Sequence, residues 1–142
     1  MIRLYIFLCI FCITNINFTF GMSREQLKKT LTIMKNQCML KNGVTNNEVG
    51  EIEKGVFLED RTVMCYIACI YKTIQVVRND RLDKDLILRQ IDILYPKDIK
   101  EAVKKSVIKC VPVQNLYEDP CEGIFYAARC LYADDPSNFI FP

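Results

Sequence analysis

Residues 61–71, RTVMCYIACIY, place two cysteines, Cys65 and Cys69, four positions apart within an apolar stretch. From Val63 to Val77 apolar residues cover most of the circumference of a helix, which predicts a central and largely buried one. Side chains at i and i+4 lie on one face of a helix and point the same way. Cys65 and Cys69 therefore cannot bridge each other without distorting the helix. Each must fasten this helix to another element.

Four further cysteines extend this constraint to the rest of the chain. Cys121 and Cys130 are nine positions apart, so on one helix they would face opposite sides, roughly 13 Å apart along the axis, and could not pair. Six cysteines allow fifteen connectivities, and the two exclusions leave ten. Of the eight cysteines, Cys9 and Cys12 lie in the apolar N-terminal segment and are set aside. The other six are Cys38, Cys65, Cys69, Cys110, Cys121 and Cys130, and the gaps between them hold 26, 3, 40, 10 and 8 residues.

The first 21 residues have the pattern of a secretory signal peptide. Arg3 supplies a positive charge, and residues 4–13 are almost continuously apolar. Thr19 and Gly21 are small residues at the positions that a signal peptidase prefers. We therefore expect residues 1–21 to be a signal peptide that is cleaved after Gly21.

An uncleaved membrane anchor is the alternative for this leader. Asn15 and Asn17 interrupt the apolar run before it reaches the roughly 20 residues that a span needs. No second long apolar run follows. We expect a secreted, extracellular protein without a membrane span, in which residues 22–142 form one domain and an even number of cysteines forms a disulfide framework.

The charge balance and the absence of histidine exclude several function classes. The chain has 19 Lys and Arg, 17 Asp and Glu, and no His, and only Arg3 of these charges lies in the leader. The mature net charge of +1 comes from interspersed residues and gives no basic stripe for nucleic acid. Missing histidine removes the usual general base and the nucleophile pairs that depend on it. Catalysis by carboxylates alone stays open, but the composition argues against an enzyme.

Apolar residues recur mostly at spacings of three and four, which predicts an all-α domain of about six helices. Ser23 with Gln26 and Thr45 with Glu48 form capping boxes at the first two helices. On the first helix Leu27, Leu31, Met34 and Cys38 share one face. The expected helices span roughly residues 23–42, 45–54, 60–77, 83–95, 96–111 and 120–133, and a tail of residues 134–142 follows.

The number of disulfides is large for a domain of this size. About 121 mature residues suffice for a self-sufficient core. A cavity in that core would lower stability, and each bridge could add about 3–4 kcal/mol. The framework therefore favours a core that is hollow.

With this cysteine spacing, the chain resembles the insect odorant-binding proteins, the family that includes the pheromone-binding proteins. The gaps of 3 and 8 residues match its fixed spacings. Met-Cys-Tyr around Cys65 and the Asp135-Pro136 pair before aromatic residues extend the resemblance over the whole mature chain. The resemblance implies a disulfide-stapled bundle of six helices around an internal hydrophobic pocket, with no cofactor or metal. Among the ten connectivities it implies Cys38–Cys69, Cys65–Cys121 and Cys110–Cys130.

The function implied by the resemblance is non-covalent carriage of small hydrophobic molecules, odorants or pheromones, through aqueous fluid. The fluid would be sensillar lymph or another body fluid, and the further partners would be a membrane odorant receptor and a second copy in a weak homodimer. The alternative is a secreted structural or interaction protein of saliva, venom or semen with the same bundle and a filled core. Some pheromone carriers release ligand at low pH through histidines, and this chain has none.

The expected pocket draws on inward-facing apolar positions of several helices. For each apolar position, the alternative is a place in an ordinary solid core. Ser106 and Tyr71 are the expected polar anchors for a ligand, and the alternative for Ser106 is a hydrogen bond to the Ala102 carbonyl. The tail is expected to cover the pocket as a lid. The residues expected to line it are Met64, Ile67, Ala68, Tyr71, Ile91, Leu94, Val103, Ser106, Val107, Ile124, Phe125, Ala128, Phe139, Ile140 and Phe141.

Overall fold

The computed structural model describes residues 21–142, so the expected signal peptide lies outside them except for Gly21. The predicted all-α, disulfide-stapled bundle of six helices is confirmed. Two 3₁₀-helices and one short antiparallel hairpin join these helices. The elements are α2 (Arg24–Asn42), α3 (Asn46–Val49), η1 (Ile52–Lys54), α4 (Arg61–Thr73), β1 (Val77–Arg78), β2 (Arg81–Leu82), α5 (Lys84–Leu94), α6 (Lys100–Cys110), η2 (Val111–Leu116) and α7 (Pro120–Asp134).

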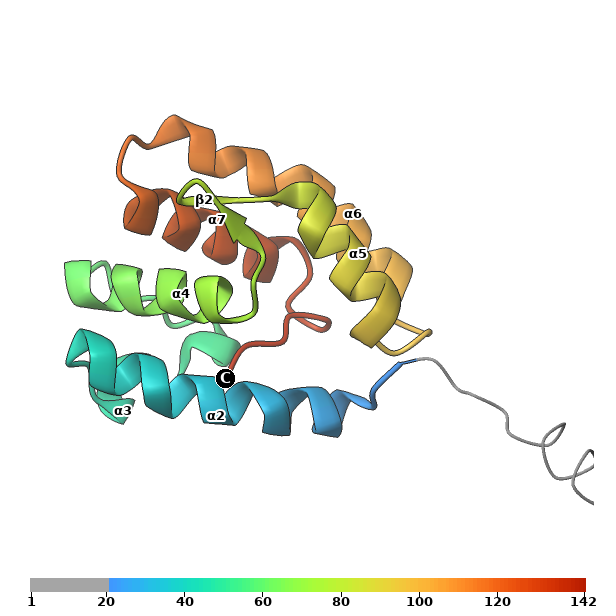
Figure 1. Cartoon of the computed structure of the whole chain (residues 1–142), viewed down its shortest axis with the longest axis horizontal. Helices are drawn as coiled ribbons and strands as arrows, with labels where there is room; N and C mark the ends of the chain where they lie inside the picture. The colour runs from blue at the N-terminus through green and yellow to red at the C-terminus, as the bar shows by residue number, and fades with distance from the viewer. Residues whose placement is uncertain (1–20) are drawn as a thin grey trace, which may run out of the picture.

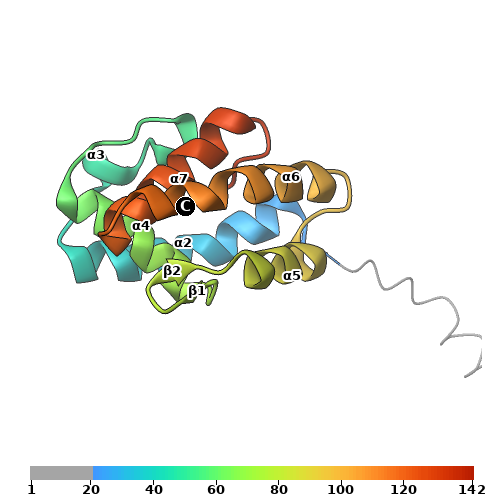
Figure 2. The same cartoon turned by 90° about the horizontal axis from the view of Figure 1, so that it is seen from above.

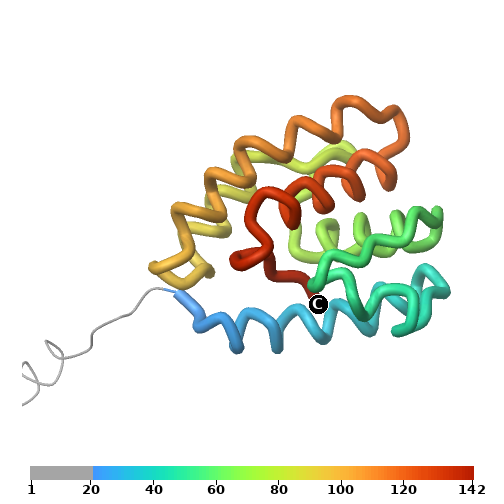
Figure 3. The backbone as a smooth tube through the Cα atoms, turned by 180° about the vertical axis from the view of Figure 1, so that it is seen from behind, coloured from blue at the N-terminus to red at the C-terminus, as the bar shows by residue number. Residues whose placement is uncertain are grey.

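The helices surround the C-terminal tail. Figure 1 shows α2 along one side of the domain, with α4 and α7 stacked above it and the α5–α6 pair at one end. After α7 the chain turns back and passes between α2 and the α5–α6 pair (Figures 1 and 3). From above, α5 and α6 lie on either side of the line that α2 follows (Figure 2). The tail therefore occupies the space that these helices leave open.

The centre of the core lies between α4 and α7. On α4, Tyr66, Ile67 and Ile70 are almost fully buried, and on α7 Ile124 and Phe125 are too. Ile70 lies four and three residues after Tyr66 and Ile67, and the buried Ala128 lies four and three residues after Ile124 and Phe125, so each set shares one face and the two faces can pack together. Burying one side chain of this size contributes roughly 1.5–3 kcal/mol. This contact is therefore a major source of stability.

Helix α4 ends at Thr73, four residues before the expected end at Val77. Gln75 has a φ of 60°, which takes the chain out of the helix. Val77 and the next residue then pair with β2. Asn79 and Asp80, at φ 49° and 59°, form the two-residue turn. Both angles suit the mirror-image turns that hairpins favour, so this β-branched segment is a strand rather than a fourth helical turn.

Three other helix boundaries differ from the expected ones. Helix α6 begins at Lys100 rather than at Pro96. Pro112 does not end the helical path at residue 111, because it occupies the first turn of η2, where its missing N–H group is tolerated. The second expected helix is divided into α3 and η1.

The hairpin is held by one buried amide. Gln114 of η2 is 4% exposed, its Oε1 accepts from the Leu82 N–H group at 2.7 Å, and its Nε2 donates to the Leu82 carbonyl at 2.9 Å. Arg81 donates to the Gln114 carbonyl at 2.7 Å. A Cβ atom at Gly123 of α7 would lie 2.9 Å from that carbonyl oxygen, so only glycine permits this approach. Three elements of the chain, β2, η2 and α7, thus meet at Gln114.

Two disulfides fasten α4 to its neighbours, as its cysteine spacing requires. Cys69 is joined to Cys38 of α2, and Cys65 to Cys121 of α7, with Cα–Cα distances of 5.8 and 4.7 Å. The third bridge joins Cys110 to Cys130 at 5.4 Å, between the ends of α6 and α7. These are the pairs that the resemblance implies. The bridges span 31, 56 and 20 residues, a range in which each contributes about 3–4 kcal/mol.

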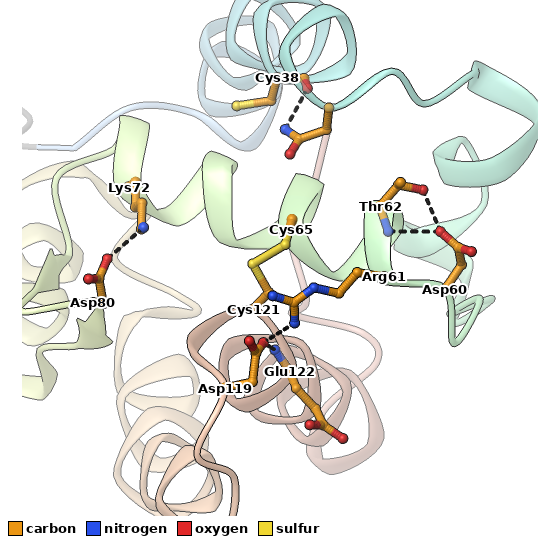
Figure 4. Close-up of a disulfide and its surroundings, with 11 residues drawn as sticks. Cys38, Asp60, Arg61, Thr62, Cys65, Lys72, Asp80, Asp119, Cys121 and Glu122 are labelled. Atoms are coloured by element: carbon orange, nitrogen blue, oxygen red, sulfur yellow. Dashed lines mark hydrogen bonds and ion pairs between the residues drawn. A yellow bond between two sulfur atoms is a disulfide. The ribbon is translucent and has the colours of Figure 1, made fainter.

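Ion pairs accompany the bridge between α4 and α7. Figure 4 shows Arg61 beside the Cys65–Cys121 disulfide, with its guanidinium directed at Asp119. Asp119 also caps α7 by accepting from the Glu122 N–H group at 2.9 Å. Arg61 and this backbone bond hold the pKa of the Asp119 carboxyl below its usual range. Because both partners are partly exposed to water, the pair orients α7 more than it stabilises the fold.

We expect Gln114→Leu to lower the free energy of unfolding by about 2–4 kcal/mol, since it leaves the buried N–H and carbonyl groups of Leu82 unpaired. Denaturant unfolding followed by circular dichroism, with the disulfides intact, measures this loss. Asn115→Ala is the matched control on the exposed side of η2, where we expect a change within about 0.5 kcal/mol. Equal effects of the two substitutions would contradict the anchoring role of Gln114.

Candidate ligand-binding cavity

A cavity of about 330 Å³ lies where the C-terminal end of α4 faces α2, α5, α6 and the tail. Its volume is at the lower end of the roughly 300–1,000 Å³ of small-molecule sites. Most of its wall is apolar. The lining residues are Met22, Leu27, Thr30, Leu31, Met34, Ile70, Tyr71, Thr73, Ile74, Gln75, Val76, Ile87, Gln90, Ile91, Leu94, Tyr95, Val103, Ser106, Val107, Leu131, Asp135, Asn138, Phe139, Ile140, Phe141 and Pro142.

The tail forms one wall of this cavity with alternating side chains. Phe139 and Phe141 pack into the main core, where their rings stack with centroids 5.9 Å apart. Ile140 packs instead with Leu27 and Leu31 of α2. Successive side chains of extended chain point to opposite sides, so three consecutive apolar residues connect two separate clusters. The tail thereby buries apolar groups that would otherwise face water.

A polar turn holds the start of the tail. The Asp135 carboxylate accepts from Ser137 Oγ at 2.6 Å and from Asn138 Nδ2 at 2.7 Å. Arg24 of α2 donates to the Ser137 carbonyl at 2.6 Å and to Asn138 Oδ1 at 3.3 Å. The hydroxyl of Ser137 and the amide of Asn138 hold the pKa of Asp135 below its usual range. The tail is thus attached to both α7 and α2.

Nine of the fifteen residues expected to line the pocket do line the cavity. They come from α5, from α6, from the end of α4 and from the tail, and they are Tyr71, Ile91, Leu94, Val103, Ser106, Val107, Phe139, Ile140 and Phe141.

The other six expected residues lie in the solid core between α4 and α7. All but Met64 are at most 2% exposed, and Met64 packs at the edge of the same cluster. The two helices are in direct contact along their central turns, so their inward faces meet each other rather than empty space. The correction applies to Met64, Ile67, Ala68, Ile124, Phe125 and Ala128.

Helix α2 supplies a wall that the expected set omitted. Leu27, Leu31 and Met34 line the cavity, and they share the apolar face that the sequence shows on the first helix. That apolar face predicts that these residues are buried. It does not predict that they lie in the half of α2 that borders the cavity. Tyr95 was also omitted, because it follows the last turn of α5, where helical periodicity no longer applies.

Ser106 lines the cavity, but its hydroxyl is engaged within the protein. It donates to Asp134 Oδ2 at 2.7 Å rather than to the Ala102 carbonyl. Lys109 pairs with the other carboxylate oxygen of Asp134. Lys109 and then Ser106 hold the pKa of Asp134 below its usual range. This network ties α6 to the end of α7 and uses the single proton that Ser106 could donate to a ligand.

Two searches of the described residues bear on other functions. Between residues 21 and 142, no helix is long and apolar enough to cross a membrane. In the same range, no group of three or more His, Cys, Asp or Glu side chains is arranged to hold a metal ion.

Comparison with known proteins gives one consistent result. The model of the PBP/GOBP family matches residues 21–134. General odorant-binding protein 72 of Anopheles gambiae is 27% identical over 122 residues, which cover 86% of this chain and all of that protein.

Solved structures agree with the sequence comparison. The crystal structure of odorant binding protein 4 of Chrysopa pallens superposes with a TM-score of 0.75 at 33% identity, covering 83% of this chain and 97% of that one. Odorant binding protein 5 of Apis mellifera gives a TM-score of 0.72 at 28% identity, covering 86% and 99%.

We expect Ser106→Ala to lower the free energy of unfolding by about 0.5–1.5 kcal/mol through the loss of a buried hydrogen bond, and to leave ligand affinity unchanged within about twofold. The stability difference should be present at neutral pH and fade as the pH falls through the lowered pKa of Asp134, where the carboxylate becomes protonated.

Urea unfolding at several pH values and displacement of a bound fluorophore measure the two effects. Lys105→Ala, on the exposed side of the same turn, is the control and should change neither quantity. A tenfold loss of affinity in Ser106→Ala without a loss of stability would restore Ser106 as a ligand anchor.

Proposed function

The chain belongs to the PBP/GOBP family, and we propose that it is a secreted carrier that binds small hydrophobic molecules, odorants or pheromones, in this cavity. Carriage of small ligands is the role supported by the family and the fold together. The cavity adds a specific location for the ligand. Secretion follows from the leader pattern of residues 1–21 and agrees with the family.

The single observation that carries the proposal is an apolar space bounded by the protein's own tail. A protein that served only as a structural or interaction component would gain stability by filling this space, because cavity walls lose dispersion contacts. The three disulfides offset that loss, so the fold can keep its shape around an incompletely filled core. This supports the carrier over the alternative of a secreted protein with a filled core.

Apolar ligand surface removed from water provides the driving force for binding. At about 25 cal/mol per Å², a ligand that buries roughly 200 Å² of apolar surface gains on the order of 5 kcal/mol. Covering the ligand matters because each uncovered part stays in water and contributes nothing. The tail, with Phe139, Ile140 and Phe141 in the wall, is the element that we expect to complete this cover.

Truncation after Asp135 tests the carrier proposal and the role of the tail together. We expect the affinity for an environment-sensitive naphthylamine fluorophore to fall at least about tenfold, or ~1.4 kcal/mol, because one apolar wall is removed. Fluorescence titration measures the affinity, and circular dichroism checks that the helices persist.

Ile33→Ser is the control, since Ile33 is an apolar residue of α2 that is 73% exposed. This substitution should leave the titration unchanged. If the full chain binds no fluorophore, the carrier proposal is wrong, and if truncation leaves the affinity unchanged, the tail does not act as a wall.

We also expect ligand affinity to change less than about twofold between pH 7 and 5.5, the range in which histidine would titrate. The carboxyl group of Asp135 lines the cavity, and its lowered pKa keeps it ionised throughout this range. Its hydrogen bonds to the tail are lost only as the pH falls below the usual Asp range. Displacement titrations at both pH values provide the measurement, and a steep fall in affinity would contradict the expectation.

A further inference from the structure

We propose that the hydroxyl groups of Tyr71 and Tyr95 form a polar subsite in the cavity that binds the uncharged oxygen of a lipophilic ligand, such as a ketone, aldehyde or ester. This inference rests on the carrier function proposed above and adds the chemical class of the ligand. Two observations carry it. Most polar groups of the cavity wall already have hydrogen-bond partners, and the wall has no positively charged side chain.

Apart from Gln75, an exposed residue of the rim, the other polar side chains of the wall have partners within the protein. Thr30 donates to the Gln26 carbonyl at 3.1 Å, and Thr73 donates to the Cys69 carbonyl at 2.8 Å. The Gln90 amide donates to the Ile74 carbonyl at 2.7 Å. The acceptors of these hydrogen bonds are backbone carbonyl groups within α2 and α4 and just after α4. The single hydroxyl proton of Thr30 and that of Thr73 are therefore used before a ligand arrives, whereas Gln90 keeps one N–H group for another acceptor.

Tyr71 and Tyr95 differ from this pattern. Both line the cavity, and among residues 21–142 the structure gives neither hydroxyl a hydrogen bond. By contrast, the hydroxyl of Tyr132, away from the cavity, donates to the Lys54 carbonyl at 2.8 Å. Both side chains are half-buried, and a tyrosine hydroxyl in such a place normally finds a hydrogen-bond partner. A ligand oxygen between the two residues would supply that partner.

The two side chains reach the cavity from different elements. Tyr71 lies in the last turn of α4, and its ring packs against Phe141 of the tail with centroids 6.2 Å apart. Tyr95 directly follows α5, next to Leu94, whose carbonyl accepts from the Met22 N–H group at 2.8 Å. Both phenols are thus placed by packed neighbours, which limits the entropy lost when they bind a ligand.

Burial keeps both phenols neutral. It raises the pKa of Tyr95 to about 12. It also raises the pKa of Tyr71, and the nearby Tyr95 phenol adds to that increase. Both phenols line the same cavity, so one ligand can reach either of them. At any physiological pH both carry their protons and can donate hydrogen bonds.

The charges of the wall select against anionic ligands. No Lys or Arg side chain lines the cavity, and Asp135 provides the one charged side chain of the wall. A carboxylate ligand would lose its hydration and meet no cation, which is strongly unfavourable. A neutral carbonyl oxygen requires only a donor, and the tyrosines provide two. The subsite therefore fits a neutral oxygen and disfavours fatty-acid anions.

Tyr66 offers a matched control. Its hydroxyl has no hydrogen-bond partner either, but Tyr66 is 0% exposed in the solid core and does not line the cavity. Tyr66→Phe therefore removes the same atom from a place that a ligand in the cavity does not touch.

The experiment compares octanone, octane and octanoate as displacers of the naphthylamine fluorophore at pH 7. In the full chain we expect octanone to bind more tightly than either relative. Tyr71→Phe and Tyr95→Phe should each weaken octanone about three- to tenfold, as expected for one hydrogen bond, and change octane less than twofold. The double variant should bind octanone and octane alike, and Tyr66→Phe should match the unaltered chain.

The outcomes separate this inference from the carrier proposal. If octane and octanone displace the fluorophore but the double variant keeps its preference for octanone, the tyrosine subsite is wrong while the carrier stands. Octanoate binding as tightly as octanone would also overturn the subsite. If no compound displaces the fluorophore from the full chain, both proposals fail. Near-ultraviolet circular dichroism establishes that each variant keeps its tertiary packing.

Discussion

The fastening of α4 to two neighbours is the constraint on which the rest of the structure depends. Cys65 and Cys69 lie on one face of the helix, so they cannot pair with each other and must bind α7 and α2. The Cys65–Cys121 bridge holds α4 against α7, and between these two helices Ile67 and Phe125 are completely buried. The solid part of the core forms there, and the remaining space lies beyond it, at the C-terminal end of α4.

The tail turns that remaining space into a bounded cavity. Its side chains alternate between two apolar clusters. Ile140 packs into the cluster on α2, and Phe139 and Phe141 pack into the main core. Arg24 and Asp135 hold the turn that directs it inward. An element with few backbone hydrogen bonds of its own thus depends on its side chains for its position. This is the kind of segment that can open locally at low free-energy cost.

Polar groups in the domain fall into two kinds with different consequences. Gln114 and Ser106 are buried and fully engaged, and they connect elements that are far apart in the sequence. Tyr71 and Tyr95 are half-buried, line the cavity and have hydroxyl groups without a hydrogen bond among residues 21–142. The first kind makes the fold specific, because a missing partner would leave buried groups unsatisfied. The second kind leaves hydrogen-bonding capacity that only a bound molecule can use.

The sequence by itself determined the helix phases, the two forbidden cysteine pairs and the inward faces of α2, α5 and α6. These properties depend on neighbours within one or two turns, which periodicity reports directly. It did not determine that the residues after Thr73 form a hairpin, because the side chain that holds the hairpin, Gln114, binds Leu82 from 32 residues away.

The sequence also could not decide whether an inward face meets atoms or empty space. Ile67 and Phe125 have the same pattern as Ile91 and Val107, yet the first two meet each other's helices and the last two border the cavity. Periodicity gives the direction of a side chain, whereas the distance between helices depends on crossings, bridges and the path of the tail. Only the tertiary structure decided where the core is hollow, because packing density is a property of all the surrounding elements together.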